Sequence, residues 1–114
     1  MTKRKPNVAE DRAIADVLDG AWDILDTEGW ARGEEAIEAI HKTTGPCCLG
    51  VAICRSARER RAAPVVGLAL QSVARHIGES VPRWNDRQSS PIRVMRVLER
   101  VADVHRLRAE GPSK

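Results

Sequence analysis

The residues of this 114-residue chain best suited to nucleophilic chemistry are its three cysteines. Cys47 and Cys48 follow Pro46, which the pattern predicts as the first turn of a helix, where the helix dipole favours a thiolate. With a histidine and the Asn85-Asp86 pair they could form a Cys–His–Asn or Cys–His–Asp arrangement. No signature of a known thiol enzyme surrounds them, so we assign no catalytic residue and keep a cysteine-dependent enzyme as a lesser alternative.

The spacing of the cysteines also predicts which thiol is exposed. On a helix that begins at Pro46, Cys47 and Cys54 share the inner face as small core residues, while Cys48 points outward with Arg55. We therefore expect Cys48 to be the most reactive thiol. Gly50 in the same helix costs about 1 kcal/mol relative to alanine, which predicts a close neighbour that needs the space.

Metal and redox chemistry find no support in the sequence. No C-x-x-C or H-x-x-x-H spacing occurs, so we expect no metal and no cofactor. An odd number of cysteines and the absence of a secretory signal favour reduced thiols in the cytoplasm. No apolar run reaches the about 18 residues that a membrane span requires, so we expect no membrane association.

Apolar spacing predicts a compact, single-domain, all-α bundle of about five helices over residues 7–110, after a disordered basic tail at 1–6. Asn7 and Glu10 form an expected N-terminal cap, and Trp22 falls on the apolar face of the first helix. The expected helices are residues 7–28, residues 31–42, a segment from Pro46 through Glu59, residues 64–77 and residues 91–108.

The stretch VPRWNDRQSSP at 81–91 is expected to be a loop. Pro82 argues against a helix there, and so against a helix-turn-helix with its recognition helix after Gly78. Trp84 is expected to fold back onto the Pro46 helix and the last helix as a structural latch, with Asn85 and Asp86 bonding nearby backbone. A ligand or partner site built on the same residues is the alternative.

Two further features lie on the last helix. His105 falls within its apolar arc, as either a satisfied core histidine or a site residue reached from the 81–91 stretch. Arg93, Arg96 and Arg100 fall within about 60° of one another at helical spacing and form a basic stripe. This stripe is either a solvated surface or a face for nucleic acid.

The formal net charge of +3 conceals a division along the chain. Residues 6–40 hold ten acidic and two basic side chains, whereas residues 41–114 hold fourteen basic and six acidic ones. Such a division permits self-complementary packing within a monomer or across a homodimer.

The pattern formed by Gly29-Trp30, the CCLG stretch at 47–50 and the WND stretch at 84–86 resembles a family of small uncharacterised actinobacterial and actinophage proteins. In that family GW is followed by C-x-x-G-A and then WND; this chain departs at Val51, where the family has alanine. The resemblance spans about residues 10–105 and implies no activity. It groups six residues as a binding or structural site: Trp30, Cys47, Gly50, Trp84, Asn85 and Asp86.

Size, charge division and the lack of a strong catalytic constellation favour a small non-enzymatic interaction or regulatory protein that binds a macromolecular partner. The expected partner is a protein, with a homodimer as one form of that interaction. A nucleic-acid-binding protein that uses the Arg-rich second half is the main alternative, and small-ligand binding near Trp84 is another.

Overall fold

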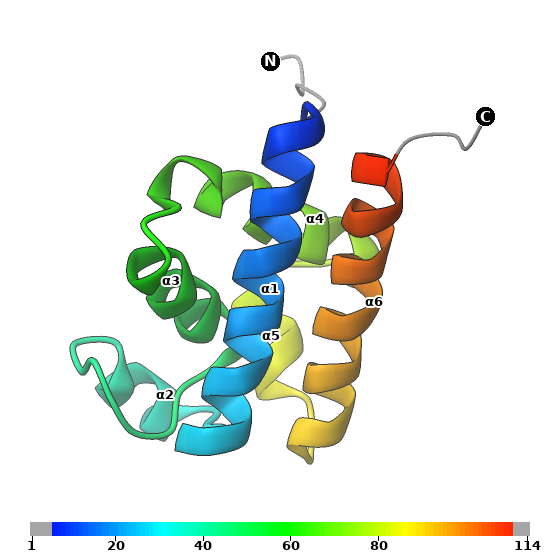
Figure 1. Ribbon diagram of the computed structural model, residues 1–114. Coiled ribbons are helices and arrows are strands. Elements are labelled where there is room, and N and C mark those ends of the chain that lie inside the picture. The colour runs from blue at the N-terminus through cyan, green and yellow to red at the C-terminus, as the bar shows by residue number, and fades with distance from the viewer. Residues whose placement is uncertain (1–5, 111–114) are drawn as a thin grey trace.

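The structure, a computed structural model, describes residues 6–110 as helices joined by short connections (Figure 1). The expected all-α fold is confirmed. All of the expected basic tail except Pro6 lies outside the described residues, and no described helix is long and apolar enough to cross a membrane. The elements are α1 (Val8–Glu28), α2 (Glu34–Ala39), α3 (Leu49–Glu59), the 3-10 helix η1 (Ala63–Val65), α4 (Val66–Ile77), α5 (Val81–Asp86) and α6 (Pro91–Glu110).

Helix α1 has the N-terminal cap that the sequence predicts. The Asn7 side chain accepts from the backbone N–H of Glu10 at 2.8 Å, and the Glu10 carboxylate accepts from the backbone N–H of Asn7 at 3.1 Å. This reciprocal pair satisfies two N–H groups that a helix start otherwise leaves without partners. The helix ends at Gly29, whose φ of +102° favours glycine.

Helix α1 forms the centre of the fold, with α3 on one side and α6 antiparallel to it on the other (Figure 1). Trp22, expected in the core, is half-buried: its ring packs against the core while its Nε1 donates to Glu99 of α6 at 2.9 Å. Arg106 of α6 pairs with Asp19 of α1 at 2.9 Å. The acidic first part of the chain therefore meets the basic last part within one molecule.

The last two long helices agree with the sequence pattern. Helix α4 ends at Gly78, which adopts the left-handed conformation with φ of +79°. Helix α6 begins at Pro91 and runs two residues beyond the expected end at Arg108. Its inward positions are buried, including Val94 and Leu98.

The prediction of a loop at 81–91 is wrong for its first half, because Val81–Asp86 forms helix α5. Pro82 lies in the first turn of this helix, where a missing N–H costs no internal hydrogen bond. At six residues, α5 is too short to serve as a recognition helix. The second helix is also shorter than expected, covering Glu34–Ala39 rather than 31–42.

The predicted register of the third helix is wrong. Helix α3 begins at Leu49, so Cys47 and Cys48 precede its first turn. Cys54 is exposed and Arg55 is buried, the reverse of the expectation. Arg55 turns inward because its guanidinium donates to backbone carbonyls in the connection between α2 and α3. Hydrogen bonds from a charged group stabilise this register over the one that apolar spacing predicts.

The close approach expected at Gly50 lies instead at Gly20. A Cβ atom at Gly50 would meet only Val81 Cγ1, at an ordinary 3.7 Å. A Cβ atom at Gly20 would lie 2.2 Å from the Oγ of Ser56 and 2.5 Å from Arg60 Nε. Ser56 is fully buried and donates to the Val17 carbonyl at 2.7 Å, so α1 and α3 touch here through backbone and hydroxyl.

We expect Gly20→Ala to lower the free energy of unfolding by about 1–3 kcal/mol, because Ser56 must leave its hydrogen bond or α3 must move. Gly67→Ala is the matched control, since nothing lies within 4 Å of a Cβ atom there and the residue is helical. That control should raise the free energy of unfolding by up to about 1 kcal/mol. Urea denaturation of both variants measures the difference, and a Gly20→Ala variant as stable as Gly67→Ala would contradict the close contact.

Candidate functional site

Asn85 of α5 is a fully buried polar side chain that joins three segments of the chain. Its Oδ1 accepts from the indole Nε1 of Trp30 at 2.7 Å and from the backbone N–H of Leu49 at 3.0 Å. Its Nδ2 donates to the Ala31 carbonyl at 3.1 Å. We call these four residues the Asn85 network.

The bond to Leu49 gives α3 a cap that its own sequence does not provide. Cys48, the N-cap residue of α3, makes no side-chain capping bond. Because the first N–H groups of a helix have no partner within it, a side-chain oxygen from elsewhere can take that place. Asn85 therefore fixes the start of α3 from a distant part of the chain.

Trp30 and Cys47 face each other in an isolated parallel bridge. The backbone N–H of Ala31 donates to the Cys47 carbonyl at 3.0 Å, and that of Cys47 donates to the Gly29 carbonyl at 3.2 Å. The Cys47 side chain is fully buried. The bridge holds the two connections that flank α2 side by side.

The residues after Asn85 bond to the start of the α2 region. Asp86 Oδ1 accepts from the backbone N–H of Gly33 at 2.9 Å. The Arg32 guanidinium donates to the backbone carbonyl of Gln88, and the buried Gln88 side chain donates to the Trp84 carbonyl at 3.0 Å. These bonds attach α5 to the connection between α1 and α2.

Of the six grouped residues, Trp30 is joined to Asn85 by a hydrogen bond and to Cys47 through the backbone bridge, and Asp86 bonds to Gly33 in the same connection. Gly50 lies just inside α3. Trp84 is half-buried and borders a hollow with Ile77 of α4 and Val97 of α6.

An apolar groove of about 620 Å³ opens beside this cluster, between α2, α3, α4 and α5. Ile37 of α2 and Ile40, the C-cap residue of that helix, form one wall and remain 65% and 55% exposed. The sequence signal for this wall is an isoleucine among the glutamates of α2, followed by a second one directly after the helix, and it was not recognised as a binding surface. The other lining residues are Gly33, Ala36, Cys48, Gly50, Val51, Cys54, Leu70, Gln71, Ala74, Val81, Pro82 and Asp86.

All three cysteines are free thiols, and two of them line the groove. Cys54 is exposed and Cys48 is half-buried. Burial raises the pKa of the Cys47 thiol to about 11, against a smaller opposing effect of the nearby Arg55 guanidinium. Cys47 is therefore a core residue, and the helix-dipole activation expected for it does not apply.

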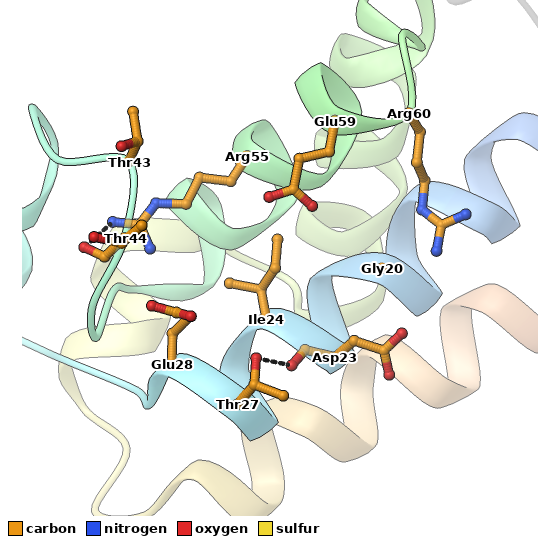
Figure 2. A pocket seen from close by; sticks show the side chains of 10 residues that line it. All are labelled: Gly20, Asp23, Ile24, Thr27, Glu28, Thr43, Thr44, Arg55, Glu59 and Arg60. Atoms are coloured by element: carbon orange, nitrogen blue, oxygen red, sulfur yellow. Dashed lines mark hydrogen bonds between the residues drawn. The ribbon is translucent and has the colours of Figure 1, made fainter.

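A polar cavity of about 240 Å³ lies on the other side of α3, against the C-terminal half of α1 (Figure 2). Arg55 reaches across it, and its guanidinium donates to the backbone carbonyls of Lys42, Thr44 and Gly45. Glu28 accepts from the backbone N–H of Gly45 at 2.6 Å. Both charged groups are used to hold the connection before Cys47, so we assign this cavity a structural role.

His105 is 1% exposed and has a partner at each ring nitrogen. Its Nδ1 lies 2.6 Å from Asp11 Oδ1, and its Nε2 lies 2.8 Å from Ser72 Oγ. Neither partner belongs to the 81–91 stretch, so His105 is the satisfied core histidine of the two alternatives. No pattern in the sequence indicated Asp11 or Ser72 as partners of His105.

The hydrogen-bonded chain Ser72–His105–Asp11 has the residue types of a serine hydrolase triad, but the described residues around it lack the oxyanion site that a triad needs. Ser72 lies in the middle of α4, where backbone N–H groups are used within the helix. A triad needs free donors beside its serine to stabilise an oxyanion. We therefore interpret these three residues as a cross-link between α1, α4 and α6.

Two substitutions at neighbouring positions test the Asn85 network: Asn85→Asp replaces an amide with a carboxylate, and Asp86→Asn does the reverse. Asn85→Asp replaces the donor to Ala31 with an oxygen and buries a charge, so the free energy of unfolding should fall by about 3 kcal/mol or more at neutral pH. Asp86→Asn keeps the acceptor for Gly33 at an exposed site, so the change should stay within about 0.5–1 kcal/mol.

The pH dependence gives this test a second readout. Acid protonates the carboxyl introduced by Asn85→Asp, and the protonated group can then donate to the Ala31 carbonyl. The difference in stability between this variant and the parent protein should therefore become smaller as the pH falls. Thermal melts between neutral and mildly acidic pH measure it. Equal stability of the two variants at neutral pH would contradict a central role for Asn85.

The thiols should react in the order of their exposure. We expect Cys54 to be labelled first by N-ethylmaleimide, Cys48 more slowly, and Cys47 only after unfolding, because its side chain is fully buried. Peptide mapping after short pulses gives the order. Labelling of Cys47 in the folded protein at the rate of Cys54 would disprove the described register.

The chain was compared with known proteins and with models of protein families. Neither a curated protein nor a solved structure matches the chain. One family model does match, over residues 9–104, and this range includes every residue of the Asn85 network and of the apolar groove. By that match the chain belongs to DUF6197, a family of unknown function.

Proposed function

We propose that this protein is a small, non-enzymatic binding protein, and that its apolar groove receives an amphipathic helix of a protein partner whose polar edge is basic. The exposure of Ile37 and Ile40 on the wall of the groove is the observation that carries this proposal. Isoleucine side chains are usually buried, and an exposed apolar surface beside a concave one is typical of a recognition site.

The chemistry of the lining supports a helix as the occupant. Of the fourteen lining residues, only Gln71 and Asp86 carry polar groups other than thiols. An amphipathic helix places apolar side chains at i, i+3, i+4 and i+7 into such a groove. The volume of about 620 Å³ accommodates several of these side chains together.

Charge supports a basic edge on that helix. Glu34, Glu35 and Glu38 are exposed on α2, and no basic residue lies within this helix. Asp86 adds a fourth carboxylate at the other wall. Lysine or arginine flanking the apolar stripe of a partner would complement these groups and speed the encounter.

The loose packing of α2 supports adaptation to a partner. Helix α2 contacts the other helices much less than they contact one another. A six-residue helix is marginal by itself, so this wall of the groove can shift with little loss of free energy.

A designed peptide tests the site without knowledge of the natural partner. A helical peptide of roughly 18 residues, with leucines at the groove-facing positions and lysines elsewhere, should bind, and its glutamate counterpart should not. Binding should slow the labelling of Cys54, because that thiol lines the groove. Fluorescence anisotropy and labelling rates measure the two effects.

Two isoleucines with nearly equal exposure provide the matched variants. Ile37→Ser should weaken peptide binding by about tenfold, as expected for a contact at the centre of an interface. Ile92→Ser removes a side chain that is 63% exposed on α6, against 65% for Ile37, and should leave binding unchanged. Equal effects of the two variants would overturn the groove as the site. A dimer that Ile37→Ser dissociates would replace the partner helix with a second copy of this chain.

We also propose a cytoplasmic setting in an actinobacterium or one of its phages. The resemblance of the GW, CCLG and WND stretches supports the source. The three free thiols fit a reducing compartment.

A further inference from the structure

A second concave surface lies between α4 and α6, away from the residues that line the apolar groove. Its wider part is a hollow of about 310 Å³ bordered by Trp84, Arg93, Arg96 and Arg100. His76 borders this hollow and also a narrower one of about 170 Å³ farther along α6. The two hollows therefore adjoin at His76, and together we call them the basic cleft.

The narrower hollow adds two more arginines, Arg75 of α4 and Arg108 of α6. No aspartate or glutamate lines either hollow, in a chain that contains 16 acidic residues. Within residues 6–110, none of the five lining arginines forms an ion pair. The cleft therefore concentrates positive charge that no side chain of the described part neutralises.

Two acidic residues of α6 have partners outside the cleft. Glu99 accepts from Trp22 of α1, and Asp103 pairs with Arg106, which also binds Asp19 of α1. Glu99 is thus engaged with α1 and Asp103 with Arg106, whereas the arginines that line the two hollows lie beside α4. Crowding like charges in a cleft destabilises the fold, and the same field attracts a polyanion.

The aromatic ring of Trp84, at one end of the cleft, indicates which kind of polyanion binds there. Trp84 is half-buried and borders the same hollow as three arginines. Arginines that follow a phosphate backbone beside an aromatic ring that stacks on a base are the combination by which proteins hold single strands. A duplex is read differently, by a helix that enters a groove about 12 Å wide, whereas these arginines line a recess between two packed helices.

We propose that the basic cleft binds single-stranded nucleic acid. The arginines of α6 contact successive phosphates, Arg75 and Arg108 extend the path, and Trp84 stacks on one base. The DNA and RNA forms share this chemistry. The proposal does not depend on the apolar groove, since the two sites have no lining residue in common.

Titration of the full chain with a fluorescent single strand of about 15 nucleotides tests the proposal, with DNA and RNA of one sequence as separate arms. At about 50 mM salt we expect binding that weakens steeply as salt is added. The combined variant Arg93→Gln, Arg96→Gln, Arg100→Gln should weaken binding by at least about tenfold. It should also reduce the slope of log affinity against log salt by about 2, because each phosphate contact on a single strand contributes about 0.7.

A matched variant removes the same charge elsewhere. Arg12→Gln, Lys42→Gln, Arg58→Gln changes three exposed cations outside both hollows, and should retain most of the affinity and the slope. Trp84→Leu should weaken binding about fivefold or more through lost stacking, and Trp84→Phe should restore part of it. Thermal melts confirm that each variant is folded before its affinity is compared.

The proposal is supported if either the DNA or the RNA strand binds and the cleft variants lose affinity as stated. The strand that binds more tightly shows whether the natural ligand is DNA or RNA. Equal losses in the two charge variants would show attraction by net charge alone and overturn the cleft. Tighter binding of the duplex than of the single strand would overturn the single-strand assignment. Binding to phosphatidylserine vesicles, with none to either strand, would overturn nucleic acid in favour of a membrane surface.

Discussion

The fold depends on one buried amide. Asn85 has no exposed surface, and three groups that would otherwise be buried without partners bond to it: the Trp30 indole, the first N–H of α3 and the Ala31 carbonyl. These groups come from parts of the chain 36 to 55 residues away from Asn85. An apolar contact could bring the same segments together, but it would not fix their orientation, because hydrophobic burial has no direction. The amide therefore determines where α3 begins and where α5 lies.

The division of charge along the chain has a similar directing effect. The acidic α1 lies beside α6, where Arg106 pairs with Asp19 and Glu99 accepts from Trp22. Surface pairs of this kind contribute only about 0–1 kcal/mol each. Their effect is on the rotation of α6, since with Glu99 and Arg106 bonded to α1, four other arginines of this helix lie beside α4: Arg93, Arg96, Arg100 and Arg108. The cleft proposed to bind nucleic acid is thus a consequence of how the central helix pair packs.

Local signals in the sequence were sufficient for the long helices. Asn7 with Glu10 marks the start of α1, Gly78 marks the end of α4, and Pro91 marks the start of α6. These are properties of short segments, which is why the pattern could predict them.

The errors arose where distant groups decide the structure. The predicted buried face of α3 was wrong because the Arg55 guanidinium turns inward. It donates there to three backbone carbonyls that lie 10 to 13 residues away in the sequence. Helix α5 was missed because its short run of residues shows no helical periodicity, and its stability comes from Asn85. The resemblance did group Trp30, Cys47, Asn85 and Asp86, yet no pattern in the sequence distinguished the hydrogen-bonding centre from its neighbours. His105 was expected inside, but its partners Asp11 and Ser72 lie 94 and 33 residues away.

Helix α5 separates the two proposed sites. Val81, Pro82 and Asp86 line the apolar groove, Trp84 lines the basic cleft, and Asn85 points into the protein between them. A helix of six residues has too few internal hydrogen bonds to hold such an arrangement by itself. The bonds of Asn85, and of Asp86 to Gly33, provide the missing constraint, so α5 is a rigid wall for both sites. Helix α2, attached mainly through its ends, is the adjustable wall of the groove. If a helix binds in the groove as proposed, α2 is thus the wall expected to move, because the hydrogen bonds of Asn85 and Asp86 hold α5 on the side of the cleft.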